Sequence, residues 1–119
     1  MVLAVRGAVQ VDRDDPAEIL TATRELITEV VDRNEIDAAD LISIVFTLTP
    51  DLTSCFPASA ARDLGLVDVP LLCATEVAVP GALPRVIRLL AHVQSDRPRA
   101  AVRHVYLRGA TLLRPDLAA

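Results

Sequence analysis

The sequence predicts a mixed α+β (α/β) fold, in which a mixed sheet of four to five strands carries two long helices on one face. Its 119 residues suit a single domain, expected to span residues 1–119. Hydrophobic residues make up 52% of the chain, too large a share for a disordered polypeptide. Alternating and helical apolar spacings follow one another as strand, helix, strand, short helix, strand, helix and strand. Helices on a sheet form a two-layer unit.

The first half of the chain predicts two strands around one long helix. Residues 2–11 alternate between apolar and other side chains, as in a half-buried strand. Asp15 and Pro16 are typical of an N-cap and a first helical position, and apolar residues at helical spacing continue to about Arg33 or Asn34. Residues 41–49 are rich in β-branched side chains and end at a proline, which indicates a buried strand.

The second half predicts a short helix, a strand, a long helix and a last strand. Residues 58–64 form a short helix that Gly65 ends, and residues 69–79 form a strand. Five apolar residues between 83 and 93 recur at helical spacing, which predicts the second long helix. Residues 102–107 read as the last strand. The sheet face without helices still carries aliphatic side chains, so we expect an oligomer.

Composition excludes several functions. The net charge of −4 disfavours a nucleic-acid-binding protein, which is normally basic. No apolar run approaches the roughly 20 residues of a membrane span. Arg6 interrupts the first apolar stretch, which no basic region precedes, so we expect no signal peptide. Cys55 and Cys73 fit neither a disulfide framework nor a zinc pattern. These features predict a reduced, cytoplasmic protein without a metal or cofactor.

Three polar residues stand within apolar strands. Arg6 lies among Val and Ala, where a charge needs a partner or a ligand. Glu76 is the only acid between residues 69 and 95, and a carboxylate there needs a cationic or hydroxyl partner. Tyr106 shares a strand face with His104. The alternatives are a structural ion pair for Arg6 and Glu76 and a core tyrosine with a satisfied hydroxyl.

Arginine is the only basic residue besides histidine, and three further arginines are candidates. Arg62 lies in the short helix, Arg88 on the flank of the second long helix, and Arg114 near the C-terminus. A solvated or ion-paired arginine is the alternative for each. The sequence has no Gly-rich phosphate loop, no nucleophile elbow and no HExxH motif. A doubly negative ligand held by several arginines is the hypothesis that remains.

Six segments in order resemble one family over nearly the whole chain. They are Val5–Ala8, Thr49–Leu52 with Phe56–Ala58, Cys73–Glu76, Ile87–Arg88, Arg103–Leu107 and Leu113–Leu117. Together they resemble the monofunctional chorismate mutases of the trimeric α/β-barrel (Bacillus-type) class. The resemblance implies a homotrimer whose three sheets pack into a pseudo-α/β barrel, with active sites between subunits. It also implies the Claisen rearrangement of chorismate to prephenate in phenylalanine and tyrosine biosynthesis, which needs no cofactor.

The resemblance also assigns roles by position. Arg88 matches the arginine that donates to the ether oxygen, and Glu76 and Cys73 match residues near the ring hydroxyl. Arg6 and Tyr106 match residues that hold the carboxylate of the enolpyruvyl side chain. The remaining matches are two rim arginines, Arg62 and Arg114, and two apolar wall residues, Phe56 and Leu113.

Two alternatives and one geometric problem accompany this hypothesis. A trimeric imine deaminase of the Rid type has a similar architecture, and a non-catalytic module that binds dicarboxylates also accounts for the arginines. Cys73 and Glu76 are three residues apart, so in a regular strand they face opposite sides. For both to reach one ligand, the strand must bulge or end between them.

Overall fold

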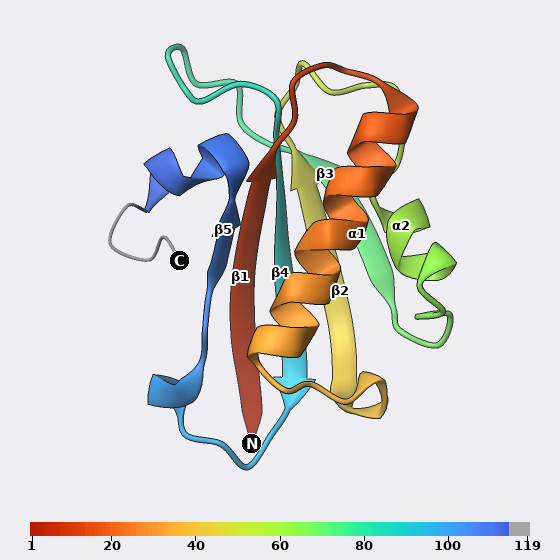
Figure 1. Ribbon diagram of the computed structural model, residues 1–119, viewed down its shortest axis with the longest axis vertical. Helices are drawn as coiled ribbons and strands as arrows, with labels where there is room; N and C mark the ends of the chain where they lie inside the picture. Colours follow the sequence, from red (N-terminus) through yellow and green to blue (C-terminus); the bar gives the residue numbers. More distant parts are fainter. Residues whose placement is uncertain (115–119) are drawn as a thin grey trace.

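The computed structural model describes residues 1–114, which form a five-stranded mixed sheet in the order β3-β2-β4-β1-β5 (Figure 1). The strands are β1 (Val2–Gln10), β2 (Leu41–Leu48), β3 (Leu71–Thr75), β4 (Val86–Gln94) and β5 (Val105–Leu107). The helices are α1 (Pro16–Arg33), α2 (Ala58–Asp63) and the 3₁₀ helices η1 (Ala38–Asp40), η2 (Arg99–Ala101) and η3 (Arg108–Leu113). β4 pairs antiparallel with β1 and β2, whereas β5 and β3 join the sheet in parallel. The predicted mixed fold is confirmed.

Helix α1 covers one face of the sheet, as Figure 1 shows. Its N-cap is Asp15, and Ile19 and Leu26 are fully buried on its inner side. Gly7 of β1 lies beneath the helix, where an added Cβ would stand 3.0 Å from a methyl group of Leu26. The absence of a side chain at Gly7 thus allows α1 to pack closely on the centre of the sheet.

The predicted second long helix is wrong, because residues 86–94 form strand β4. Every second residue from Ile87 to Val93 is buried, while Arg88 and His92 between them are only partly buried. The apolar residues of this segment fit both a helical and an alternating period. Pairing decides between them, since β4 satisfies its backbone groups against β1 on one side and β2 on the other. One long helix, together with the short α2, therefore covers the sheet.

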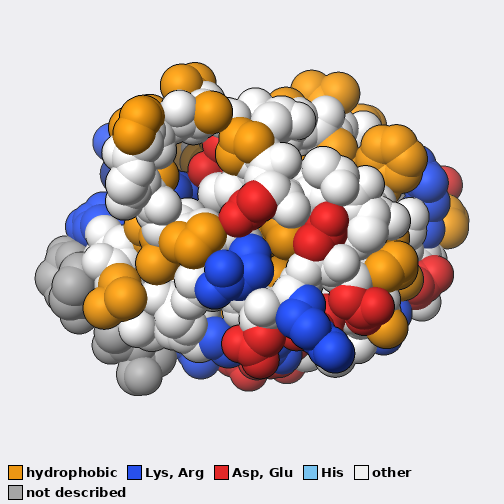
Figure 2. All heavy atoms as spheres, turned by 90° about the horizontal axis from the view of Figure 1, so that it is seen from above, with side chains coloured by type: hydrophobic (Ala, Val, Ile, Leu, Met, Phe, Trp, Pro, Cys, Tyr) orange, Lys and Arg blue, Asp and Glu red, His pale blue; other side chains and the backbone are white. Residues whose placement is uncertain are grey.

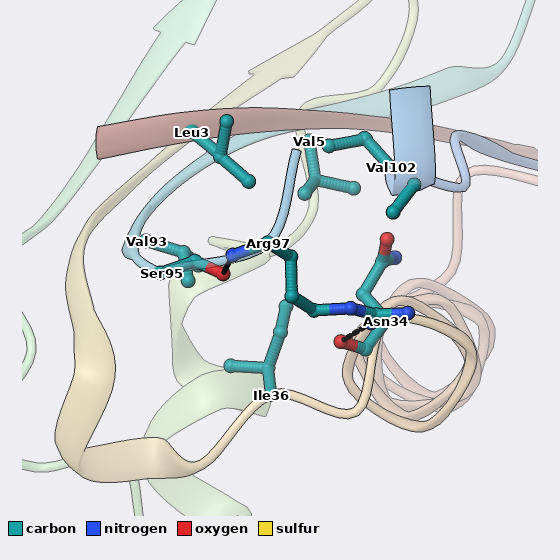
Figure 3. A pocket seen from close by; sticks show the side chains of 9 residues that line it. Leu3, Val5, Asn34, Ile36, Val93, Ser95, Arg97 and Val102 are labelled. Carbon is teal, nitrogen blue, oxygen red and sulfur yellow. Dashed lines mark hydrogen bonds between the residues drawn. The ribbon is translucent and has the colours of Figure 1, made fainter. Parts of the chain in front are cut away.

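The end of α1 is tied to the segment before β5. Asn34 donates a hydrogen bond to the Arg103 carbonyl (2.9 Å) and accepts one from the Arg103 N–H (2.7 Å). Arg97 points towards α1 and donates to the Asn34 carbonyl at 2.7 Å (Figure 3). The small cavity beside them has a volume of about 20 Å³, room for about one water. These hydrogen bonds thus fix the segment that leads into β5, the strand that carries Tyr106.

The other face of the sheet is covered at one end only. There Ala8, Val86, Tyr106 and Ala110 form a second, smaller core. Farther along, Val2 of β1 and Leu72 of β3 are 54% and 62% exposed. None of the helices within residues 1–114 has the length and apolar character needed to cross a membrane. The oligomer expected from this apolar face stays a prediction.

The N-cap of α1 gives a test of the local folding signal. The Asp15 carboxylate accepts from the Glu18 N–H at 3.1 Å. Asp15→Ala is expected to lower the free energy of unfolding by about 1 kcal/mol, because that N–H loses its partner. Asp15→Ser keeps an acceptor and is expected to retain most of the stability in urea denaturation. An equal loss in both variants would contradict the capping role.

Candidate active site

One row of residues across the sheet brings two candidate side chains, Arg88 and Tyr106, to the same face. Arg88 of β4 lies opposite Thr47 of β2 on one side and opposite Ala8 of β1 on the other. Ala8 in turn lies opposite Tyr106 of β5. Directly paired residues point to the same side of a sheet, here the side away from α1. The small side chain of Ala8 leaves space between Arg88 and Tyr106.

An ion pair joins Arg88 to Glu76. The Nε of Arg88 donates to Oε2 of Glu76 at 3.0 Å, and Thr47 Oγ1 donates to the same oxygen at 2.6 Å. The Glu76 side chain is 17% exposed and that of Arg88 is 42% exposed. Within residues 1–114, only Nε of the Arg88 guanidinium is engaged, so its two terminal nitrogens are available to a ligand.

The position of Glu76 follows from the end of β3. The strand stops at Thr75, and the Glu76 N–H still donates to the Leu48 carbonyl at 2.8 Å. The carboxylate can therefore turn towards Thr47 and Arg88. The strand thus ends between Cys73 and Glu76, which the sequence analysis required if both side chains are to reach one ligand. Cys73, however, pairs with the fully buried Phe46 and lies on the helix-covered side of the sheet.

Arg6 completes the cationic side of this hollow. The hollow has a volume of about 280 Å³, and Arg6, Thr47, Arg88 and Tyr106 are its polar lining residues. Arg6 lies two residues from Ala8 on β1 and so shares its face. Its backbone N–H donates to Nδ1 of His104 at 2.9 Å. We call these four polar lining residues, together with Glu76, the arginine half-site.

Three other candidates lie elsewhere on the chain. Phe56 and Cys73 line a hollow of about 390 Å³ beside Cys55. Phe56 is 72% exposed, and Arg62 is exposed on α2, which packs near β3. We call Phe56, Arg62 and Cys73 the α2 half-site. Its Cys73 lies on the helix-covered face of the sheet, whereas Arg88 and Tyr106 of the arginine half-site lie on the opposite face. One chain therefore does not join the two sets.

Leu113 and Arg114 lie on the side of the arginine half-site. Leu113 packs against the small core that contains Tyr106. Burial lowers the pKa of His104, and the positive charges of Arg6 and Arg114 lower that pKa further. Arg114 is thus close enough to His104 to add to the positive field that Arg6 creates.

The loop between β3 and β4 stands beside this end of the sheet. Its Val77 and Val79 are 83% and 58% exposed. The view from above shows hydrophobic side chains on the projecting loop, with acidic and basic side chains gathered next to it (Figure 2). The loop and residues Thr49–Asp51 enclose a third hollow, of about 260 Å³, which Glu76 also lines.

Two polar residues of the site were missed by the sequence analysis as contributors. Thr47 is a hydroxyl donor to Glu76, and His104 is an acceptor for Arg6. The available signal for Thr47 was a polar residue inside an apolar strand, the same signal that singled out Arg6 and Glu76. Its partner lies 29 residues away, so only the strand pairing identifies the contact.

Cys55 and Cys73, which line the hollow of the α2 half-site, are free thiols. Burial raises the pKa of Cys55, and the nearby Asp63 and Cys73 raise it further. Cys55 is therefore a neutral thiol at neutral pH and a poor nucleophile. Chemically, the arginine half-site offers one guanidinium held by a carboxylate, a second guanidinium in the same hollow, and two hydroxyls for an anionic ligand.

The lowered pKa of His104 predicts a pH dependence of stability. The folded state binds fewer protons at this residue than the unfolded state, so stability falls as the pH drops below about 6.5. His104→Asn keeps an acceptor for the Arg6 N–H but does not titrate. Urea denaturation is expected to show a steeper loss of stability between pH 7 and 5 for the wild type. Parallel curves for both proteins would contradict this assignment.

Comparison with known proteins adds independent evidence. The family model for chorismate mutase type I matches residues 2–117. A Thermus thermophilus protein named chorismate mutase AroH is 54% identical over 98% of this chain and 97% of its own length. Chorismate mutase AroH of Bacillus subtilis is 41% identical, over 98% of this chain and 93% of its own.

A solved structure agrees with the sequence relatives. The chorismate mutase from Clostridium thermocellum superposes with a TM-score of 0.91 at 41% identity, covering 92% of this chain and 98% of its own. Family model, sequence relatives and structure all extend over nearly the whole chain. The chain therefore belongs to the chorismate mutase type I family.

Proposed function

We propose that this protein is a chorismate mutase, which rearranges chorismate to prephenate in aromatic amino acid biosynthesis. The observation that carries the proposal is the Arg88 guanidinium, which Glu76 holds by its Nε at 3.0 Å while no other residue up to position 114 engages its terminal nitrogens. Membership of the chorismate mutase type I family supports the same activity. The reaction is pericyclic: one C–O bond breaks while one C–C bond forms within a single molecule.

Arg88 supplies the electrostatic part of catalysis. As the C–O bond breaks, electron density builds on the ether oxygen, and a terminal nitrogen of Arg88 donates a hydrogen bond to it. A donor aimed at charge that develops only in the transition state lowers the barrier without tightening substrate binding equally. Glu76 orients this donor, and its carboxylate faces the carbocyclic ring as the ring becomes electron-poor.

The other residues hold chorismate in its compact conformation. Arg6 and Tyr106 bind the carboxylate of the enolpyruvyl side chain, since both line the hollow beside Arg88. A guanidinium suits this task because its planar fork binds a carboxylate through two parallel hydrogen bonds. Holding this carboxylate while Arg88 binds the ether oxygen places the reacting carbons together and removes an entropic part of the barrier.

The α2 half-site completes the cleft from a neighbouring subunit of a homotrimer. Phe56 is 72% exposed and Arg62 is exposed. Such exposure is expected of residues that a second subunit covers. The uncovered sheet face, with Val2 and Leu72 exposed, supplies the apolar surface for the trimer. Leu113 and Arg114 then border the cleft on the side of Tyr106, and Cys73 lies near the ring hydroxyl.

Three further parts of the account stay predictions. A cytoplasmic location agrees with the free thiols of Cys55 and Cys73. A lack of nucleic-acid binding agrees with the net charge of −4. Residues 1–119 are expected to act as a single domain.

Arg88→Ala tests the catalytic role. The variant is expected to fold and to lose at least about 10²–10³-fold in kcat, because the transition-state donor is gone. Arg88→Lys is expected to be severely impaired as well, because an ammonium lacks the fork. The measurement is the absorbance of chorismate during turnover. Arg99→Ala, an exposed arginine on η2, is the matched control and should retain activity. Undiminished turnover in Arg88→Ala would refute the role.

A mixing experiment tests the shared cleft. Arg88→Ala damages one half-site and Arg62→Glu damages the other, so each variant alone is expected to be poorly active. Refolding them together at equal amounts is expected to restore roughly a quarter of wild-type activity, since that share of clefts in a head-to-tail ring has both halves intact. No recovery, with mixed trimers present by mass spectrometry, would contradict a cleft formed between subunits.

A further inference from the structure

We propose that Asp51 is a positioning residue for catalysis: it holds the chain at Arg85 and so secures the start of β4, the strand that presents Arg88. The activity readout of this inference rests on the proposed function. Asp51 follows β2, in the Thr49–Leu52 segment, and Arg85 directly precedes β4. No role was assigned to either residue by the sequence.

Arg85 has an unusual backbone conformation. Its φ is +54°, in the left-handed region that an L-residue with a side chain rarely adopts. The two carboxylate oxygens of Asp51 accept hydrogen bonds from the Arg85 N–H, at 3.2 and 3.0 Å. Thr49 Oγ1 donates to the same carboxylate at 2.5 Å. A strained residue persists when its surroundings hold it from several sides, as they do here.

The same network joins the ends of three strands. At the end of β2, Thr49 exchanges hydrogen bonds of 3.0 Å with Val86, the first residue of β4: its N–H donates to the Val86 carbonyl, and its Oγ1 accepts from the Val86 N–H. Past the end of β1, Val11 donates to the Arg85 carbonyl at 2.9 Å and accepts from Arg85 Nε at 3.1 Å. Arg85 and Val86 thus tie the start of β4 to the ends of both neighbouring strands, in addition to the strand pairing along β4.

Pairing with β1 and β2 and the buried residues of one face set the register of β4, and the anchor at Arg85 secures its first residues. The loop that precedes it is exposed over residues 77–82, and Pro84 has no N–H to donate. A slip of one residue would turn the Arg88 side chain from the ligand face to the helix-covered core. Arg88 lies only three residues beyond Arg85. Asp51 therefore acts on the reaction through the direction of Arg88, without contact with the substrate.

The chain offers a matched control in Asp14. Its carboxylate also holds the loop after β2, accepting from the Thr53 N–H, the Thr53 hydroxyl and the Ser54 N–H, each at 3.1 Å. None of these bonds reaches β4. Both carboxylates thus bond to the segment that follows β2, but only Asp51 also holds Arg85. Comparing the two variants therefore isolates the effect of the contact with Arg85.

The experiment measures steady-state kinetics and thermal unfolding of Asp51→Ala, Asp51→Asn, Asp14→Ala and Arg85→Gly. Asp51→Ala is expected to lower kcat about 10- to 100-fold with a smaller change in KM. The reason is that the Arg88 guanidinium is displaced from the ether oxygen but is still present. Asp14→Ala is expected to lose similar thermal stability while keeping kcat. Asp51→Asn retains an acceptor oxygen and is expected to lie between the wild type and Asp51→Ala.

The double variant Asp51→Ala/Arg85→Gly separates positioning from general stability. Glycine adopts the left-handed conformation without strain, so it is expected to restore much of the kcat lost in Asp51→Ala. The NMR signal of the Arg88 Nε–H, assigned by its absence in Arg88→Lys, should shift in Asp51→Ala and stay unchanged in Asp14→Ala. This signal reports the ion pair with Glu76 and does not depend on turnover.

Two results would overturn the inference: equal kcat in Asp51→Ala and Asp14→Ala, or an unchanged Arg88 signal in Asp51→Ala. If the wild type did not convert chorismate, the proposed function would fail, and the Arg88 signal alone would decide the role of Asp51.

Discussion

The ion pair between Arg88 and Glu76 is the interaction on which the site depends. At 3.0 Å and with side chains 42% and 17% exposed, the pair is only partly shielded from water. Partly exposed ion pairs contribute little to stability. The main effect of this pair is therefore to orient the Arg88 side chain. An arginine side chain has many rotamers, and a carboxylate bound to Nε selects one of them. Thr47 in turn fixes the carboxylate, and the Arg88 side chain that it holds lines the hollow.

The sheet delivers these groups because β4 lies at its centre. Pairing with β2 places Thr47 beside Arg88, and pairing with β1 brings Ala8 and, beyond it, Tyr106 into the same row. Residues from distant parts of the chain thus share one face without a long loop between them. The helix-covered face supplies the rigid core for this arrangement, with α1 packed over Gly7. The arginine half-site and the main hydrophobic core therefore lie on opposite faces of one sheet.

Much of the fold follows from local patterns, and the exceptions have physical causes. Alternation predicted β1, and the Asp15–Pro16 start predicted α1. The helix expected over residues 83–93 was wrong because its apolar residues also suit a strand with both neighbours paired. Arg6, Glu76 and Tyr106 stood out as polar groups within apolar strands, whereas Arg88 gained its role from the family resemblance. The contacts of Thr47 and Asp51 depend on pairing across the sheet, which no local pattern contains. Cys73 of the α2 half-site lies on the other face of the sheet from Arg88, so the relation between them was not readable from spacing.

The central claim is that Arg88, oriented by Glu76, donates to the ether oxygen of a doubly negative ligand. The most direct measurement is a crystal structure of the protein with a bicyclic transition-state mimic that contains this oxygen. The account predicts a terminal nitrogen of Arg88 within hydrogen-bond distance of the ether oxygen, with Nε still bound to Glu76 and Phe56 of a neighbouring subunit against the ligand. A mimic bound with its ether oxygen away from Arg88, or outside the hollow shared with Arg6 and Tyr106, would contradict it.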